Sequence, residues 1–528
     1  MKLLISGLLG LLSYAVIASS AAQLPFGGEN AFSTYDDGLF TPLGDLSALS
    51  STEFTTLSHP VFSRHKVRVK QSHFCDGSVR AYTGYIDIEA RHLFFYFFES
   101  RRDPDTDDII FWTNGGPGAS STMGLFMELG PCRVTSSKET EPHPYGWNDH
   151  ANIFFVDQPV GVGFSYAEYG ESVGTTKEAG DDITAFMSIF FEHFTKFKGR
   201  ALHLSGESYG GRYIPVFASA IYDHNPRLIE AGLTPINLSS IMIGNGCTDF
   251  ATMFPSYYLA QCEDPTFPAI QGISDCVRMK QLVPRCEKRF RESCVDKFDM
   301  IDCGAAAEFC EKSLSGPFND LNHYDRARPC KGLSIAECYP IIQDIGDFLN
   351  KKHIQSLIGV DPSVRGHTSF NWSSHTVNQA FAKNLDEFSF PAHYYIAALL
   401  ERGIRTLIYV GATDYICNWV RLQSSSLTRS LHLFDFAVRL GGEADKDFHA
   451  AQMGNEAMTL GLEWTRKDEF RREPLHVWTI KGNQIAGLTR SGGGLTFATI
   501  VGAGHMAPYD RPVESLELAN RWLAGEAL

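Results

Sequence analysis

The spacing of apolar residues changes along the chain, and each change predicts a different kind of structure. Apolar and polar residues alternate within 66–70 and 82–88, and residues 93–98 are apolar throughout. Such patterns predict strands, so we expect these segments to form an antiparallel edge of a sheet. From 109 to 245, short apolar runs alternate with helical patterns, which predicts a mostly parallel α/β sheet.

Residues 250–385 break this alternation. They combine short helical patterns and loops with eight of the twelve cysteines. We expect a mainly helical, disulfide-rich insertion there, a lid that covers the site. The α/β pattern resumes with strands at 406–410 and 495–501. The sequence therefore divides the core into a first part at 61–249 and a second part at 386–528.

Gly206-x-Ser208-x-Gly210 has the pattern of a nucleophile elbow. An apolar run at 201–204 precedes it and a helical pattern at 212–222 follows it, which is the strand, turn and helix that the motif requires. Glycines suit the flanking positions because a sharp turn brings neighbouring backbones close together. The alternative is an ordinary glycine-rich turn with a capping serine, and the other catalytic residues decide between the two.

Two further residues come directly after predicted core strands. Asp414 follows the strand at 406–410, and His505 follows the strand at 495–501. The order Ser208, Asp414, His505 along the chain is that of an α/β-hydrolase triad. We therefore expect an α/β-hydrolase fold in which Ser208 attacks, His505 is the general base and Asp414 orients His505.

A glycine-rich loop, Asn114-Gly-Gly-Pro-Gly118, follows the predicted strand at 109–112. Glycines after a buried strand leave backbone N–H groups free, and an oxyanion hole needs such donors. The alternative is a plain glycine turn. The elbow serine downstream favours the oxyanion hole.

The first 22 residues have the features of a secretory signal peptide, with Lys2, an apolar run to about residue 17 and small residues at 18–22. Residues 23–60 are polar and form either an extended N-terminal arm or a removable propeptide. No later segment reaches about 18 consecutive apolar residues, so we expect no membrane contact after the signal peptide is removed. The expected destination is the extracellular space, with a vacuole or another acidic secretory-pathway compartment as the alternative.

Composition narrows the function further. A formal net charge of −15 argues against nucleic-acid partners and suits a protein that works where acidity neutralises part of its carboxylates. Twelve cysteines in a secreted chain imply disulfides. A metal site is not expected, because the cysteines are widely spaced and no Cys-x-x-Cys occurs. Asn237-Leu-Ser239 and Asn371-Trp-Ser373 are sequons for N-glycosylation.

Five motifs carry a resemblance to a known family. They are Asn114-Gly-Gly-Pro-Gly118, Asp157-Gln-Pro-Val-Gly-Val-Gly-Phe-Ser165, Gly206-Glu-Ser-Tyr-Gly-Gly-Arg-Tyr213, Asp414-Tyr-Ile-Cys-Asn-Trp419 and Gly504-His-Met-Ala-Pro508. From about residue 82 to residue 522 the chain resembles the serine carboxypeptidases of the carboxypeptidase Y and cathepsin A type, and among these the secreted fungal members. The resemblance implies hydrolysis of single amino acids from peptide or protein C-termini at acid pH, through an acyl-enzyme and without a cofactor.

The resemblance also implies a site for the substrate's C-terminal carboxylate. In the family this site contains a tryptophan, an asparagine and two glutamates that share a proton. The matching positions here are Trp112, Asn114, Gly115, Glu128 and Glu207. Two carboxyls in one dry pocket cannot both ionise cheaply, so one pKa rises and the protonated pair can donate to a carboxylate. Without the resemblance, these glutamates would be interpreted as surface charge.

Two further pairs of residues take roles from the family. The oxyanion donors are expected to be the backbone N–H groups of Gly116 and Tyr209. The substrate pocket is expected to include Ile416 and Cys417, with Cys417 as the family's free thiol.

Within this resemblance, cysteine spacing suggests most of the disulfides. The expected pairs in the insertion are Cys262–Cys276, Cys286–Cys310, Cys294–Cys303 and Cys330–Cys338. Of the remaining Cys75, Cys132 and Cys247, we expect Cys75–Cys132 to pair. Family members usually carry a cysteine after Asn-Gly-Gly-Pro-Gly that is bridged to the insertion. Here that position is Ala119, so the bridge is absent or rerouted.

Two other functions use the same fold. A plant-type acyltransferase would pass the acyl group to an alcohol, and a catalytically inactive member would serve adhesion or protection of a partner. Glu128 and Glu207 together with Asn114 favour peptide C-termini over an acyl acceptor, and the complete triad argues against an inactive fold. The sequence leaves a homodimer open.

Overall fold

The computed structural model describes residues 41–75, 77–264, 267–315, 321–330, 334–365, 369–418 and 454–528. The signal peptide expected at 1–22, and the arm or propeptide expected at 23–60 as far as residue 40, lie outside the described residues. The remainder of that segment joins the fold. Its strand β1 (Thr55–Ser58) pairs antiparallel with β2 (His65–Ser72), and Leu57 is buried.

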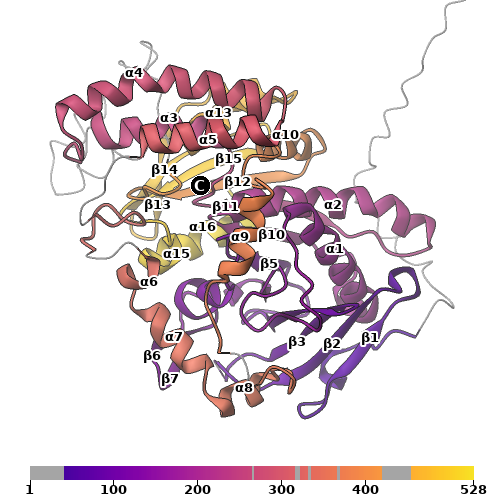
Figure 1. Cartoon of the computed structure of the whole chain (residues 1–528). Helices are drawn as coiled ribbons and strands as arrows, with labels where there is room; N and C mark the ends of the chain where they lie inside the picture. Colours follow the sequence, from indigo (N-terminus) through magenta and orange to yellow (C-terminus); the bar gives the residue numbers. More distant parts are fainter. Residues whose placement is uncertain are drawn as a thin grey trace, which may run out of the picture. The chain divides into compact units, whose positions relative to one another are not determined.

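A mixed sheet of 13 strands organises the described chain (Figure 1). The strand order is β1-β2-β3-β4-β8-β5-β10-β11-β12-β15-β14-β13, and β9 pairs with β4. The neighbours from β8 to β15 are parallel, whereas both flanks of the sheet are antiparallel, which confirms the mostly parallel sheet expected from the pattern. The other strands are β3 (Ala81–Ile88), β4 (Arg91–Phe98), β5 (Ile109–Thr113), β8 (Asn152–Val156), β9 (Tyr166–Ala167), β10 (Leu202–Glu207), β11 (Leu238–Gly244), β12 (Arg405–Gly411), β13 (His476–Ile480), β14 (Gln484–Gly492) and β15 (Leu495–Ile500).

The central strands are apolar at successive positions because both faces of the sheet are covered. Alternate side chains of a strand point to opposite faces. In β5, Ile110 and Trp112 belong to the same core as Trp522, while Phe111 contacts the ring of Phe217 on the other side, with centroids 6.3 Å apart. The covering helices are α1 (Thr176–His193), α2 (Gly210–Glu230) and α10 (Ala392–Glu401) on the face of Phe217, and α16 (Pro512–Ala524), which carries Trp522.

Helix α2 is longer than the sequence pattern at 212–222 predicts. It continues through Pro215 and Pro226 to Glu230. Proline removes one backbone hydrogen bond, and here the packing of α2 on β10, β11 and α1 outweighs that loss. None of the described helices is both long enough and apolar enough to cross a lipid bilayer.

The inserted helices form two groups with different packing. Three helices, α3 (Phe250–Cys262), α4 (Ile273–Phe290) and α5 (Met300–Leu314), surround an apolar cluster of their own that includes four disulfide-bonded cysteines of the insertion and Cys417. Figure 1 shows α4 and α5 running side by side. The second group packs on the main core instead: α6 (Ile335–Cys338), α7 (Ile341–Leu349) and α8 (Lys352–Ile358), with α7 against β6 (Cys132–Ser136) of the small hairpin β6–β7, where β7 is Glu139–Pro142. Helix α9 (His375–Lys383) follows them.

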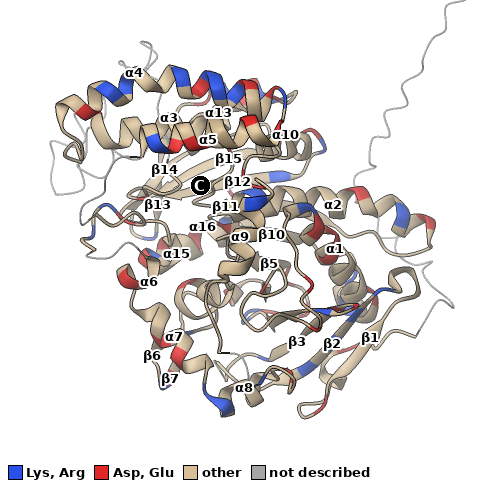
Figure 2. Ribbon diagram, in the orientation of Figure 1, with Lys and Arg blue, Asp and Glu red and all other residues tan. Residues whose placement is uncertain are grey.

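Lysine and arginine residues recur along α4 (Figure 2). Arg285 and Arg289 lie over the ring of Phe309 on α5, at 5.4 and 4.7 Å from its centroid, and Lys280 pairs with Glu263. The charged face of α4 therefore contributes to the packing of the insertion's helices on each other.

An aromatic cluster joins the antiparallel flank of the sheet to its parallel centre. The ring centroid of Phe154 on β8 lies 4.2 Å from that of Phe97 on β4. It lies 5.3 and 4.9 Å from the ring centroids of Phe186 and Phe190 on α1. Phe154 is fully buried. It therefore holds β4, β8 and α1 together.

We expect Phe154→Ala to lower the free energy of unfolding by about 3–5 kcal/mol, because the cavity it leaves cannot collapse between two strands and a helix. Urea-induced unfolding measures this change. The matched control is Tyr169→Ala, since Tyr169 is 83% exposed, and there the change should stay within about 0.5 kcal/mol. Equal losses in the two variants would contradict the structure of this core.

Candidate active site

Ser208 occupies the turn between β10 and α2 with a φ of 62°, in the left-handed region. Its backbone is held from both sides, since its N–H donates to the carbonyl of Gly244 (3.1 Å) and its carbonyl accepts from the N–H of Cys247 (2.9 Å). A Cβ at Gly206 would lie 2.8 Å from Ile214 Cγ1, and one at Gly211 would lie 2.4 Å from Thr248 Oγ1. Only glycine fits these two positions. At Gly210, the second glycine of the sequence motif, a Cβ would lie 3.7 Å from the carbonyl oxygen of Thr113, which is ordinary contact, so the expected crowding occurs at Gly206 and not at Gly210.

His505 and Asp414 meet at the same edge of the sheet. Both follow strands of the parallel centre, and β10, β11, β12 and β15 are neighbours in that order. The Nδ1–H of His505 donates to Oδ2 of Asp414 (2.9 Å), and the amide of Asn245 donates to the same oxygen (2.9 Å). Both triad side chains are buried. With Nδ1 engaged by the carboxylate, Nε2 is the nitrogen left to exchange a proton with a nucleophile.

The glycine-rich loop lies directly against the elbow. A Cβ at Gly115 would approach the backbone nitrogen of Tyr209 to 2.2 Å, so no other residue fits there. The next residue, Gly116, has a φ of 106° and is exposed, and Ser208 itself is partly exposed. Gly115 thus packs directly against the backbone of Tyr209 and against Ser208, and Gly116 is the next residue of the loop.

Asp157 binds the residues that directly follow the glycine-rich loop. Its Oδ1 accepts from Ser120 Oγ (2.6 Å) and from the N–H of Ser121 (2.9 Å), and a Cβ at Gly163 would lie 2.0 Å from its Oδ2. Complete burial raises the pKa of Asp157 to about 7 in spite of these hydrogen bonds. The sequence motif at 157–165 is therefore a support for the glycine-rich loop.

Two glutamates share a buried site one residue away from Ser208. The amide of Asn114 donates to Glu128 Oε1 (3.2 Å) and to Glu207 Oε1 (3.4 Å), while its own Oδ1 accepts from Trp112 Nε1 (2.9 Å). All four side chains are buried. Trp112 thus orients the Asn114 amide so that its N–H groups face the two carboxyls.

Burial raises the pKa of both glutamates. For Glu207 the neighbouring carboxyl of Glu128 raises the pKa further, and the charge of Asp414 adds to this effect. For Glu128 the charges of His505 and Arg133 act in the opposite direction. The pair therefore keeps a proton to higher pH than an exposed carboxyl would. Asp414 and His505 thus each change the pKa of one of the glutamates, so the charges of the glutamate pair and of these two residues affect one another.

The sequence interpretation of Cys417 as a free thiol is wrong. Cys417 is bonded to Cys247, with a Cα–Cα distance of 5.1 Å, and the described cysteines include no free thiol. The two residues follow β12 and β11, which are adjacent parallel strands, so their loops meet at one edge of the sheet although 170 residues separate them. The even number of cysteines was a signal against a free thiol, because one free thiol among twelve cysteines must leave another cysteine unpaired.

The other disulfides occur where the sequence interpretation placed them. Cys75 is bonded to Cys132, and the four pairs within the insertion are Cys262–Cys276, Cys286–Cys310, Cys294–Cys303 and Cys330–Cys338. Ala119, at the position where the family has a cysteine, forms an isolated backbone bridge with Ser373 instead. Six disulfides indicate that the chain folds in the oxidising secretory pathway.

Three further expected residues lie in different settings. Ile416 is partly exposed beside Asp414, whose Oδ1 accepts from its N–H (3.1 Å). Of the two sequon asparagines, Asn371 is exposed, whereas the amide of Asn237 donates to the carbonyl of Gly199 (3.0 Å). A glycan on Asn237 would have to break that hydrogen bond.

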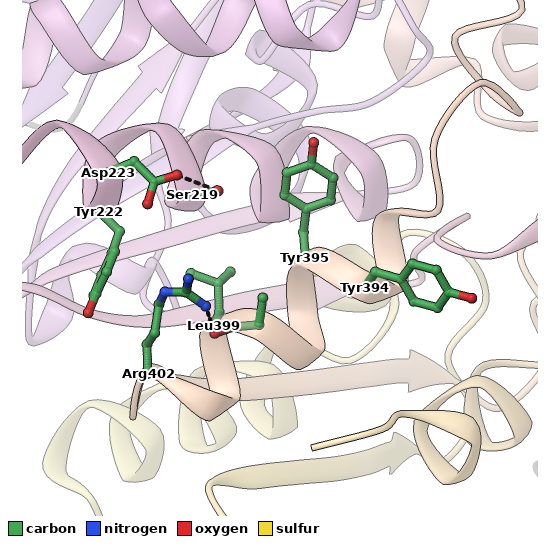
Figure 3. Close-up of a pocket in the computed structure, with 8 residues that line it drawn as sticks. Ser219, Tyr222, Asp223, Tyr394, Tyr395, Leu399 and Arg402 are labelled. Carbon is green, nitrogen blue, oxygen red and sulfur yellow. Dashed lines mark hydrogen bonds between the residues drawn. The ribbon is translucent and has the colours of Figure 1, made fainter. Parts of the chain in front are cut away.

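A prominent surface hollow lies elsewhere. It is bordered by α2 and α10 and lined by Tyr222, Tyr394, Tyr395 and Arg402 among others (Figure 3). None of the residues that line this hollow is Ser208, Asp414 or His505. The candidate active site is therefore located by the ends of the strands and not by this hollow. Among the residues that the structure describes, no group of three His, Cys, Asp or Glu side chains is placed to hold a metal ion.

Sequence reasoning missed Asn245. Its backbone has a φ of 46°, and its side-chain amide donates both to Asp414 Oδ2 and to the carbonyl of Gly504 (3.2 Å), one residue before His505. The only signal in the sequence was an Asn between two glycines after an apolar strand, which resembles an ordinary turn.

Comparison with known proteins places this site in a family. The serine carboxypeptidase family model matches residues 74–434 and 440–525. The chain is 38% identical over 453 residues to carboxypeptidase Y homolog A of Phaeosphaeria nodorum, which covers 85% of this chain and 74% of that protein. The Arthroderma otae homolog is 38% identical over 460 residues, covering 85% and 75%.

A solved structure shares the fold. Kex1(Δ)p, a prohormone-processing carboxypeptidase from Saccharomyces cerevisiae, is 21% identical, with a TM-score of 0.65 over 86% of this chain and 93% of that one. This likeness confirms the α/β-hydrolase fold with a helical insertion. The chain therefore belongs to the serine carboxypeptidase family and is a serine-type carboxypeptidase of the carboxypeptidase Y kind.

Proposed function

We propose that this enzyme removes single amino acids from peptide C-termini at acid pH, through an acyl-enzyme on Ser208. One observation carries the proposal: the amide of Asn114 bridges two buried glutamates, Glu128 and Glu207, and Glu207 directly precedes the elbow serine. A site that holds a free carboxylate beside the nucleophile selects the last peptide bond of a chain and rejects internal ones.

In the proposed reaction, Ser208 Oγ attacks the scissile carbonyl while Nε2 of His505 takes its proton. Asp414 holds the imidazole through Nδ1 and stabilises the imidazolium that forms. The backbone N–H groups of Gly116 and Tyr209 are proposed to stabilise the oxyanion. Tyr209 is the N-cap residue of α2, so the positive end of that helix dipole lies at the same place.

The leaving amine then takes the proton from His505, and the C-terminal amino acid departs. Water, activated by His505, hydrolyses the ester on Ser208 and restores the hydroxyl. The substrate's terminal carboxylate is proposed to accept from the protonated Glu128–Glu207 pair, from the Asn114 amide and from the N–H of Gly115. Trp112 acts through Asn114.

Ile416 and the Cys247–Cys417 disulfide are proposed to border the pocket for the substrate side chain, because Ile416 lies two residues after Asp414 and the N–H of Cys247 donates to the carbonyl of Ser208 (2.9 Å). Secretion is the proposed destination, with an acidic vacuole as the alternative, and activity at acid pH suits both.

Ser208→Ala should lower kcat/KM for release of the C-terminal amino acid from an N-blocked dipeptide by roughly 10⁵–10⁶-fold, the loss typical of removing such a nucleophile. Amino-acid release at pH 4.5 measures it. Ser219→Ala, on the outer side of α2, is the matched serine control and should stay within about twofold of the wild type. Residual activity above about 1% in Ser208→Ala would refute the assignment of the nucleophile.

The raised pKa of Glu207 gives a second prediction with a definite sign. A carboxyl whose pKa is raised keeps its proton at pH 4.5 and loses it as pH rises, after which the ionised pair repels a carboxylate. We expect KM for a dipeptide with a free C-terminus to rise at least about tenfold between pH 4.5 and pH 7.5.

Glu207→Gln should flatten this rise, because glutamine does not titrate. Steady-state kinetics on two matched substrates test the point, one with a free C-terminal carboxylate and one with a C-terminal amide. The KM of the amide substrate should change little with pH in either enzyme. The same pH dependence of KM for both substrates would mean that the glutamate pair does not bind the carboxylate.

A further inference from the structure

Part of the insertion, residues 321–330, lies directly on the two loops that carry Asp414 and His505. The carbonyl of Tyr324 accepts from the N–H of His505 (2.6 Å), and the N–H of Arg326 donates to the carbonyl of Thr413 (2.9 Å). The backbone of this segment, which we call the clamp segment, is therefore hydrogen-bonded to His505 itself and to the residue before Asp414.

Within the clamp segment, Asp325 binds the loop of Asp414. Its Oδ1 accepts from Thr413 Oγ1 (2.5 Å) and from the N–H of Ala327 (2.9 Å), and its Oδ2 lies 3.0 Å from Nε of Arg328. The side chain of Asp325 is 2% exposed. One oxygen of this carboxyl thus holds the residue before Asp414, and the other holds an arginine.

The same arginine reaches the loop of His505. Nη1 of Arg328 lies 2.8 Å from Oδ1 of Asp510, whose side chain is fully buried. Oδ2 of Asp510 accepts from the N–H of Gly504 (2.8 Å), the residue before His505. Arg328 therefore connects two buried carboxylates, each of which is bonded to the residue preceding a triad side chain.

Little free space remains between these parts. A Cβ on Gly504 would lie 2.4 Å from the carbonyl oxygen of Tyr324 and 2.6 Å from Cβ of Asp325. The loop of His505 thus rests on the clamp segment without a gap. A shift of Asp325 or Arg328 would move Gly504, and with it His505.

We propose that Arg328 and Asp510 are positioning residues for His505, which set the distance and angle between its imidazole and Ser208 through the Asp325–Arg328–Asp510 bridge. This inference rests on the proposed function, in which His505 is the base. The bridge does not touch substrate, so it acts on kcat and not on substrate binding. Misplacement of a catalytic group by about 1 Å can cost up to about 10²-fold in rate.

Charge on the bridge makes its effect depend on pH. Burial raises the pKa of Asp510 to about 6 and also raises that of Asp325, although Arg328 opposes both changes. Ionised Asp510 pairs with Arg328; once protonated, as pH falls through about 6, it loses the ionic part of that contact. The other titratable groups around Asp510 are Glu128, Glu207 and Tyr339, with Arg133 beside the preceding residues.

Arg328→Ala is the first test. We expect kcat for an N-blocked dipeptide at pH 7.0 to fall ~10-fold with KM within about twofold of the wild type. Arg402→Ala is the matched control and should leave kcat unchanged, because Arg402 is an exposed arginine at the C-cap of α10. If Arg328→Ala fails to fold, Arg328→Lys supplies the measurement, since lysine keeps the charge but cannot bind both carboxylates with a planar fork.

Asp510→Asn separates positioning from a merely structural role. Asparagine can still accept from the N–H of Gly504 but is uncharged at every pH, like protonated Asp510. We therefore expect kcat of Asp510→Asn to match the wild type at pH 4.5 and to fall several-fold below it at pH 7.0. A loss of the same factor at both pH values would overturn the proposal, as would unchanged kcat at both.

The rate at which a small fluorophosphonate labels Ser208 provides a readout without a peptide. It needs His505 as base but no carboxylate site, and it should fall in Arg328→Ala by the same factor as kcat. If the fluorophosphonate labels Ser208 of the wild-type enzyme but the enzyme releases no amino acid from the dipeptide, the carboxypeptidase proposal is refuted. The labelling rate then still tests the bridge. Labelling in Arg328→Ala at the wild-type rate would overturn the bridge alone.

Discussion

The site depends on one backbone constraint, the left-handed turn at Ser208. A residue other than glycine in this conformation costs roughly 1–3 kcal/mol, and it persists only where the surroundings hold it. Here the carbonyl of Gly244 and the N–H of Cys247 bond to Ser208, and Gly115 packs against the next amide. Gly115 and Gly206 lack a Cβ where neighbouring backbone atoms would lie 2.2 and 2.9 Å from it, whereas Gly210 has room for one.

The turn at Ser208 lies at the edge of the sheet where the neighbouring parallel strands also end. β11 supplies Gly244 and Asn245, β12 leads to Asp414 and β15 leads to His505. Since the strands are neighbours, loops that are far apart in sequence become adjacent, and the Cys247–Cys417 disulfide joins two of them. The insertion belongs to this arrangement, because its residues 321–330 bond to the loops of both Asp414 and His505.

The same packing buries several carboxyl groups and raises their pKa values. The folded state raises the pKa of Asp157 to about 7 and that of Asp510 to about 6, and it raises those of Glu128 and Glu207. A carboxyl whose pKa is raised on folding contributes stability below its unfolded pKa, near 4, and this contribution disappears as pH rises through the folded value. The interior that creates the site is thus suited to acid conditions, in which these groups remain protonated.

The sequence by itself determined the fold class and was enough to predict the triad, because both depend on local patterns. Apolar runs alternating with helical patterns predict a parallel sheet, and Ser208, Asp414 and His505 each follow a strand in the order of an α/β-hydrolase. The roles of Glu128 and Glu207 came only from the family resemblance, since nothing in their local sequence marks a buried residue. The partner of Cys417, the contacts of Asn245 and the Asp325–Arg328–Asp510 bridge were decided by the tertiary structure. They join residues up to 259 positions apart, across strands whose adjacency no local pattern encodes.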